Sequence, residues 1–220
     1  MDGVPVRIVL RPIGSPLTIG MAGLAIASFV QSGVELSWVS KSQSAQTGLI
    51  LLAVPFVLQL LASIFSYFAR DGAAGAALGV LAVTWLAVGL VDITAGTART
   101  SGSLGLALLA AAAVLACSAA AVSTAKPLPA TIFLVTALRF ACAGIYQLSS
   151  SGVWQSIAGI IGLLITAGAT YCVFAFELED QRRHPVLPTF RRGVGASAIG
   201  NGAHAQVVDI ENEAGVRQTT

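Results

Sequence analysis

The chain contains six long and nearly uncharged apolar segments, separated by short breaks that are polar or carry glycine and proline. A helix needs about 20 mostly apolar residues to cross the hydrocarbon core of a bilayer, and in lipid it satisfies its own backbone hydrogen bonds. Strands of a membrane barrel would be shorter and would alternate apolar with polar residues. The sequence therefore predicts an all-α integral membrane protein with helices at roughly Leu17–Val39, Gly48–Phe68, Ala73–Ile93, Leu104–Val122, Ala130–Leu148 and Val153–Phe176.

Composition supports the same fold class. Hydrophobic residues make up 55% of the chain, charged residues only 10%, and the mean hydropathy is +0.83. Soluble domains carry about 25% charged residues, so this chain has too few charges to cover a globule exposed to water. The formal net charge of +2 is small and the basic residues form no stripe, so we expect no nucleic-acid partner.

The breaks between the segments are short, so neighbouring spans are expected to pack as antiparallel hairpins of one bundle. With an even number of spans both termini lie on one side, and most Lys and Arg residues fall on that side. The positive-inside rule then predicts cytoplasmic termini in a multi-pass protein of the plasma membrane. We expect residues 1–16 to be a cytoplasmic segment, 17–176 the six-helix domain, and 177–220 a polar cytoplasmic tail, disordered after residue 193. The first apolar run is expected to remain as a membrane helix, because no convincing cleavage site follows it.

No feature of the sequence indicates an enzyme or a cofactor. Cys117, Cys142 and Cys172 lie in apolar runs without CxxC spacing, so they are expected to be buried, inert thiols and no metal or other cofactor is expected. The sequence has no GxSxG, HExxH or GxxxxGK[ST] motif. We therefore expect the chain to be no enzyme, and not to drive transport with ATP by itself.

Three charged residues lie within the spans: Glu35, Asp92 and Arg139. Placing an arginine at the centre of a membrane costs about 2.5 to more than 10 kcal/mol. A charged residue there is therefore expected to have a structural or functional role. Glu35 and Asp92 fall near the outer ends of their helices, where they can reach the interface. Arg139 falls near mid-depth, where it either forms a structural pair with an acid or with carbonyl groups, or supplies a cation to a path.

Polar residues recur at helical spacing on otherwise apolar helices. The stripes are Leu24, Ser28, Gln31 and Glu35; Gln59, Ser63 and Ser66; Thr136, Arg139 and Tyr146; and Gln155, Gly159, Gly162 and Thr166. Such stripes serve either for hydrogen bonds between helices or as the wall of a wet path, and four in one bundle favour a path. A path with one central cation and no acid at the same depth would favour a small anion. Glycines are expected to allow close helix contacts at Gly75, Gly79, Gly105, Gly159, Gly162 and Gly168.

Several segments match motifs of one known family. The first helix opens with "SPLTIGMAGL", which keeps Pro16 and Gly20, and the second hairpin reads "GLILLAVPF" and "SYFARDG". The third helix contains "VTWLAV", which keeps only Trp85 of an aromatic pair. The best match is the last helix and its exit, "AGIIGLLITAGATYCVFAFELEDQRRHPVLPTFRRG". From about Ser15 to Gly193 the chain resembles a divergent member of the acetate uptake transporter family, also called succinate–acetate permeases.

The resemblance implies six membrane helices per subunit, a homo-oligomeric ring of six subunits in the lipid bilayer, and one pore in each subunit. It implies movement of acetate and often succinate, together with protons. It also implies a narrow apolar constriction, which the family pattern places near Leu24, Leu81 and Leu138.

The chain departs from the family pattern at several points. Ser15 and Thr18 replace an Asn and a Pro of the opening motif, and leucines replace the aromatic constriction. The spans contain no Asn, and Arg139 lies where the family has no basic residue. Three functions therefore stay open: a carboxylate channel or proton-linked carrier, a channel for a small neutral solute such as urea or an amide, and a non-transporting scaffold whose tail binds a partner.

Overall fold

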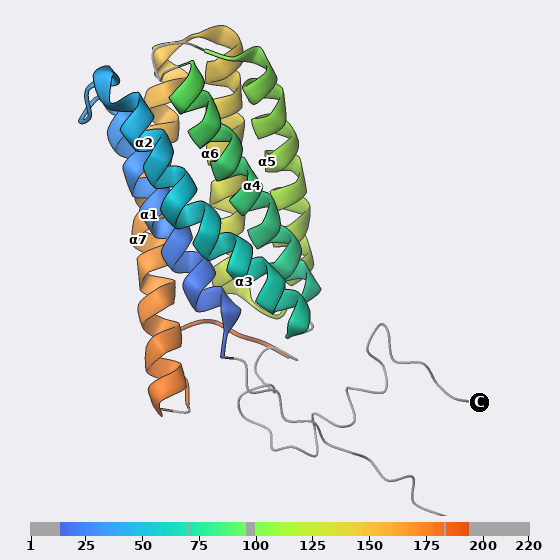
Figure 1. Cartoon of the computed structure of the whole chain (residues 1–220). Coiled ribbons are helices and arrows are strands. Elements are labelled where there is room, and N and C mark those ends of the chain that lie inside the picture. The colour runs from blue at the N-terminus through green and yellow to red at the C-terminus, as the bar shows by residue number, and fades with distance from the viewer. Residues whose placement is uncertain (1–13, 70, 96–99, 183, 194–220) are drawn as a thin grey trace, which may run out of the picture.

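The computed structural model of the chain describes residues 14–69, 71–95, 100–182 and 184–193 (Figure 1). Within this part, six helical spans are long and apolar enough to cross a membrane. They are α1 (Pro16–Glu35), the continuous run of α2 (Ser44–Leu51), η2 (Leu52–Phe56) and α3 (Val57–Phe68), α4 (Gly72–Thr94), α5 (Gly102–Val122), α6 (Pro127–Ser149) and α7 (Gly152–Arg182). A short 3-10 turn, η1 (Lys41–Gln43), precedes α2. The six predicted spans are confirmed, and the chain has the fold of a multi-pass membrane protein.

Most helix bounds differ from the predicted ones by a few residues, and two of the helix ends have a clear structural reason. The first helix ends at Glu35 rather than Val39 because Ser37 adopts a positive φ of 62°. The N–H of Trp38 then donates to the carbonyl of Gly33 at 2.7 Å, which closes the helix end. The last helix instead continues past Phe176 to Arg182, since the polar residues after the apolar stretch keep helical geometry.

The second span contains a proline without being broken by it. Pro55 has no N–H, and its ring would clash with the carbonyl four residues earlier in a regular helix. The chain widens there into the π-helical turn η2, which includes Pro55, and regular helix resumes at Val57. A wide turn of this kind relieves the clash locally, so the span continues to Phe68.

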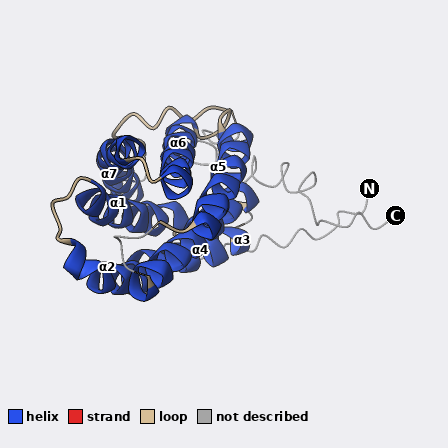
Figure 2. Cartoon of the chain, turned by 90° about the horizontal axis from the view of Figure 1, so that it is seen from above, coloured by secondary structure: helices blue, strands red, loops and turns tan. Residues whose placement is uncertain are grey.

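The six spans form a closed ring. Along this ring α1 packs on α3, α3 on α4, α4 on α5, α5 on α6, and α6 on α7. The ring closes because α7 also packs along α1, as the view from above shows (Figure 2). Spans that follow one another in the sequence therefore pack together, as predicted, and α1 begins at the same end of the bundle at which α7 finishes (Figure 1). We call this the Pro16 end and the opposite one the Glu35 end.

Polar contacts join the start of α4 to the start of α6 at the Pro16 end. The side chain of Asp71 accepts a hydrogen bond from the N–H of Ala74 at the start of α4, and it pairs with Lys126 at the start of α6. An aspartate at this position caps a helix, since it satisfies a free backbone N–H and meets the positive end of the helix dipole.

Residues 184–193 fold back along α7. The hydroxyl of Tyr171 donates to the carbonyl of Pro188 at 3.0 Å, and Arg191 pairs with Glu179 at 2.8 Å. The guanidinium of Arg191 also lies 5.2 Å from the ring centroid of Phe176. The first part of the predicted tail is thus helix and docked chain, and the predicted disorder after residue 193 lies outside the described residues.

Glycine allows α5 and α6 to touch through their backbones. A Cβ on Gly144 would lie 2.9 Å from the carbonyl oxygen of Gly105, and a Cβ on Gly105 would lie 3.0 Å from that of Gly144. The predicted close contact at Gly105 is confirmed. At Gly168 a Cβ would meet only the side chain of Ile132 at 3.6 Å, an ordinary contact, so the close approach predicted there is wrong.

We predict that Gly144→Ala destabilises the bundle by about 1–3 kcal/mol, because the added methyl group meets a backbone oxygen that cannot move without the helix. Gly168→Ala is the matched control, and it should be neutral or gain up to about 1 kcal/mol from higher helix propensity. Unfolding of both variants in detergent, followed by tryptophan fluorescence, measures the difference. Equal stability of the two variants would contradict the proposed contact.

Candidate functional site

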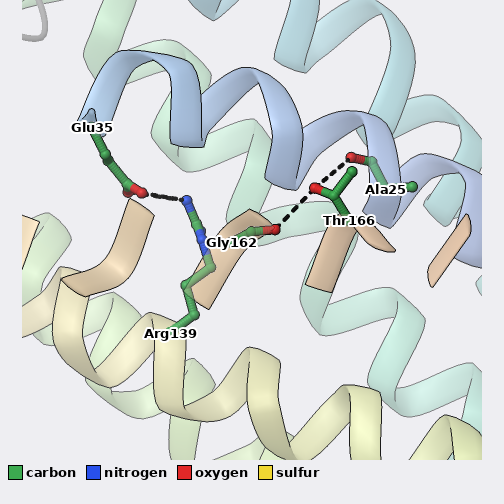
Figure 3. Close-up of polar contacts among 5 residues, drawn as sticks. All are labelled: Ala25, Glu35, Arg139, Gly162 and Thr166. Carbon is green, nitrogen blue, oxygen red and sulfur yellow. Dashed lines mark hydrogen bonds and ion pairs between the residues drawn. The ribbon is translucent and has the colours of Figure 1, made fainter. Parts of the chain in front are cut away.

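Arg139 of α6 lies inside the ring and is paired with an acid. Its side chain is 1% exposed, and its Nη2 donates to both carboxylate oxygens of Glu35, at 3.0 and 2.9 Å (Figure 3). Glu35, the last residue of α1, is itself only 8% exposed. The expectation that Glu35 reaches the interface, with no acid at the depth of Arg139, is therefore wrong. Both charges lie away from water, and they compensate each other in the low-dielectric interior.

The arginine is held by three further helices. A Cβ on Gly162 of α7 would lie 2.9 Å from Arg139 Nε and 3.3 Å from the carbonyl oxygen of Ser28, so only glycine leaves room here (Figure 3). The Trp85 ring of α4 lies 5.5 Å from the guanidinium carbon, within the range of a cation–π contact. Contacts with α1, α4 and α7 therefore fix the position of a side chain that begins on α6.

A cavity lies beside this pair. Its volume is about 40 Å³, which is room for a few water molecules. Its walls come from α1, α4, α5, α6 and α7, and in each helix from the part nearer the Glu35 end. The lining residues are Gln31, Val34, Glu35, Trp85, Val88, Val91, Asp92, Leu104, Leu108, Arg139, Phe140, Ala143, Tyr146, Gln147 and Gln155.

Several buried polar atoms of the lining residues have no hydrogen-bond partner within the described part of the chain. They are Gln31 Oε1, Trp85 Nε1, Asp92 Oδ2 and Arg139 Nε. Buried polar atoms are rarely left unpaired in proteins, because each loses its hydration without replacement. Unpaired donors and acceptors therefore lie in the packed walls around the cavity, on the same side chains that line it.

The structure brings together four of the residues predicted for a path. Gln31, Glu35, Arg139 and Tyr146 line the cavity. Their stripes on α1 and α6 face each other across the ring, so two of the four predicted stripes share one space. Gln155 of the α7 stripe joins them at the cavity wall.

Other predicted path residues form contacts between or within helices. The amide of Gln59 donates to the carbonyl of Gly20 at 3.3 Å and ties the second span to α1. The hydroxyl of Thr166 donates to Gly162 at 2.9 Å and lies 3.4 Å from the Ala25 carbonyl (Figure 3). Ser28 is fully buried where α1 faces α7. These residues correspond to the alternative in which polar side chains bind helices together.

The three predicted constriction leucines do not share one environment. Leu24 and Leu81 are completely buried in the core. Leu138 is 56% exposed on the outside of the bundle, so its predicted place in the constriction is wrong. Consecutive residues of a helix point about 100° apart, and Arg139 and Phe140 both face the cavity, so Leu138 on the far side of Arg139 is turned outward.

Aromatic side chains bound the cavity on the side of the Pro16 end. Trp85 and Phe140 are both completely buried, and their rings meet edge to face with centroids 5.5 Å apart. Leu81 lies one helical turn beyond Trp85 toward the Pro16 end, and Leu24 one turn beyond Ser28. We call Leu24, Leu81, Trp85 and Phe140 the apolar layer.

The sequence interpretation missed several cavity residues. Asp92 was expected to reach the interface and was not named as a path residue, although it is 6% exposed and lies at heptad spacing from Trp85. Gln147 lines the cavity and accepts a hydrogen bond from the N–H of Ser101 at 2.8 Å, which ties the end of α6 to the start of α5. Gln147 lies eight residues after Arg139, which places both on one helix face, and this spacing can be read from the sequence.

The cysteines lie apart from this site. Cys142 and Cys172 are buried free thiols, as predicted, whereas Cys117 is exposed on the outside of α5, and its predicted burial is wrong. The alanine-rich helix α5 turns part of its surface outward, where an apolar thiol suits lipid as well as a core. Within the described ranges no group of three or more His, Cys, Asp and Glu side chains is placed to hold a metal ion.

Comparisons with known proteins give a fold but no family. No family model matches the sequence, and no curated protein matches it. Among solved structures the chain is similar to the bacterial acetate channel SatP, with a TM-score of 0.71 and 16% sequence identity, over 80% of this chain and 99% of that one. At this identity the likeness shows the fold alone, and that fold is the acetate-transporter-like one that the sequence resemblance predicted.

Proposed function

We propose that the protein is a channel or proton-linked transporter of the plasma membrane for acetate and related small monocarboxylates, with succinate as a further substrate, and that it is no enzyme. The observation that carries the proposal is Arg139, a buried cation that already binds both oxygens of a carboxylate beside a polar cavity inside a ring of membrane spans. The likeness in fold to an acetate channel supports it.

Arginine is the side chain best suited to recognise a carboxylate. Its guanidinium stays charged, and its N–H groups match the geometry of a carboxylate. Urea or an amide needs no buried cation, which is expensive to maintain in a membrane. The site therefore favours a carboxylate over the neutral solutes.

The route through the ring is divided between the cavity and the apolar layer. A solute entering at the Glu35 end would reach Arg139 and then meet Trp85 and Phe140. No opening through the apolar layer is part of this arrangement, so permeation requires these side chains to move. An apolar barrier of this kind excludes hydrated ions and favours a compact solute whose charge is neutralised.

Orientation and assembly complete the proposal. From the positive-inside rule we infer that the Pro16 end faces the cytoplasm and the Glu35 end the outside. We further infer a homo-oligomeric ring of six copies, as the family resemblance implies. Large apolar side chains such as Phe29, Leu138 and Leu164 are more than half exposed on the bundle surface, where lipid or neighbouring copies would cover them.

We predict that proteoliposomes of the parent protein take up labelled acetate, and that the double variant Glu35→Gln with Arg139→Gln takes it up about 10- to 100-fold more slowly. That range corresponds to the loss of a charge-assisted hydrogen bond worth about 1.5–3 kcal/mol. Both charges are removed together because a single substitution would leave one buried charge uncompensated. Uptake with and without an imposed pH gradient separates proton-linked transport from a channel.

The matched control for this experiment is Glu179→Gln with Arg191→Gln, which removes an Arg–Glu pair at the other end of the bundle. It should keep the parent's acetate flux. Urea flux without acetate flux would favour the neutral-solute channel, and flux of neither would favour the scaffold. Equal loss of acetate flux in the two double variants would contradict a specific role for Arg139.

We predict that Leu81→Ala raises the flux of longer monocarboxylates such as butyrate relative to acetate, because it thins the apolar layer. Leu138→Ala carries the same change on the outer surface and should leave this ratio unchanged. Competition between labelled acetate and unlabelled butyrate in proteoliposomes measures the ratio. An identical ratio in both variants would show that Leu81 is not part of the barrier.

A further inference from the structure

The end of the Glu35 side chain has the structure of an acetate ion. Its Cγ, Cδ, Oε1 and Oε2 atoms have the connectivity of acetate's heavy atoms, and both oxygens lie at hydrogen-bond distance from Arg139 Nη2. Glu35 ends α1 at the edge of the cavity, so its carboxylate is next to the space that a solute would enter. The protein's own chain thus fills the position that suits a small carboxylate.

We propose that Glu35 is an internal ligand that occupies the substrate position on Arg139, and that an incoming carboxylate must displace it. This inference rests on the proposed function and names the exchange that the same site would perform. Arg139 then exchanges one carboxylate for another, and its buried charge stays compensated throughout. A purely structural pair would not need the cavity that lies beside it.

The charges around the pair decide what must accompany the exchange. Besides Arg139, the titratable groups that face the cavity with Glu35 are Asp92 of α4 and Tyr146 of α6. The cavity walls from α5 and α7 contribute only uncharged side chains, Leu104, Leu108 and Gln155. Two carboxyl groups thus share the cavity with one guanidinium, and a third carboxylate adds a charge that no further cation among the described lining residues offsets.

A proton balances this charge. The incoming acetate accepts the Nη2 hydrogen bonds of Arg139, and the displaced Glu35 carboxylate takes up a proton from the outer solution, forming an O–H bond. One acetate anion and one proton have then entered, and the net charge of the site is unchanged. The protonated carboxyl then shares the cavity with Asp92, the second carboxyl group of its lining.

The first test replaces the internal ligand by the free one. Glu35→Ala removes the atoms that correspond to acetate and leaves Arg139 without its counter-ion, so its melting temperature should fall below that of the parent. Added sodium acetate should restore most of the loss by filling the space, whereas sodium chloride at equal ionic strength and sodium benzoate should not. Glu179→Ala removes the same atoms beside Arg191, a more exposed arginine that also contacts Phe176, and should show no such acetate-specific gain.

Equal gains from acetate in both alanine variants, or equal gains from chloride and acetate in Glu35→Ala, would overturn the proposal. If Glu35→Ala accumulates as folded protein only when acetate is present during expression and purification, that dependence supports it. Acetate uptake by the parent protein is measured separately. Absence of that uptake rejects the proposed function, whereas failure of acetate rescue alone rejects the internal ligand.

The second test counts protons in proteoliposomes of Glu35→Gln, which keeps the shape of the side chain but cannot take up a proton. The parent should move one proton with each acetate, as read from an internal pH dye together with labelled acetate. At whatever reduced rate Glu35→Gln moves acetate, the number of protons moved with each acetate should fall well below one, so that a pH gradient no longer drives accumulation. A variant that still carries one proton per acetate would contradict the role of Glu35 and assign the proton to Asp92.

Discussion

The ion pair between Arg139 and Glu35 is the interaction on which the interior of this bundle depends. Neither charge can stay buried alone, since removing one partner of such a pair generally costs about 3–5 kcal/mol. The pair joins α6 to the end of α1, and Gly162 of α7 and Trp85 of α4 make room for it and contact it. One side chain thus engages helices from four parts of the ring, which fixes where they meet.

The closed ring of helices places the pair of Arg139 and Glu35 in its interior. Because α7 packs back along α1, the six spans enclose a common axis rather than forming a flat row. On one side of Arg139 this axis carries a polar cavity, and on the other side it is filled by the apolar layer. The cavity, the charged pair and the apolar layer therefore follow one another along one line, so a solute from the Glu35 end would meet Arg139 before the apolar layer.

Much of the fold could be predicted from the sequence because hydropathy acts locally. The six spans and the pairing of sequence neighbours followed from apolar runs and short breaks. The ends of helices were harder, because the early stop at Glu35 depends on the backbone of Ser37 and on a hydrogen bond back to Gly33. The last helix, α7, continues to Arg182, so a helix need not end where its apolar residues end.

The candidate site could be predicted only in part, for a reason that particular residues make clear. Helical spacing grouped Gln31 with Glu35 and Arg139 with Tyr146, and these four residues do share the cavity. Spacing could not tell that Gln59 bonds to a neighbouring backbone, or that Leu138 faces outward, because rotation about a helix axis is set by the partners on each side. Asp92 was missed for the same reason.

By itself the sequence determined that this chain lies in a membrane as six helices, and that one arginine within them needed compensation. Those properties follow from the free energy of moving each segment and each charge out of water into lipid. That free energy hardly depends on the other segments. Only the tertiary structure decided which acid compensates Arg139, which stripes face a cavity, and which bind helices together. Such choices require α1 and α6 to face each other across one closed ring, and no periodicity along a single helix contains that information.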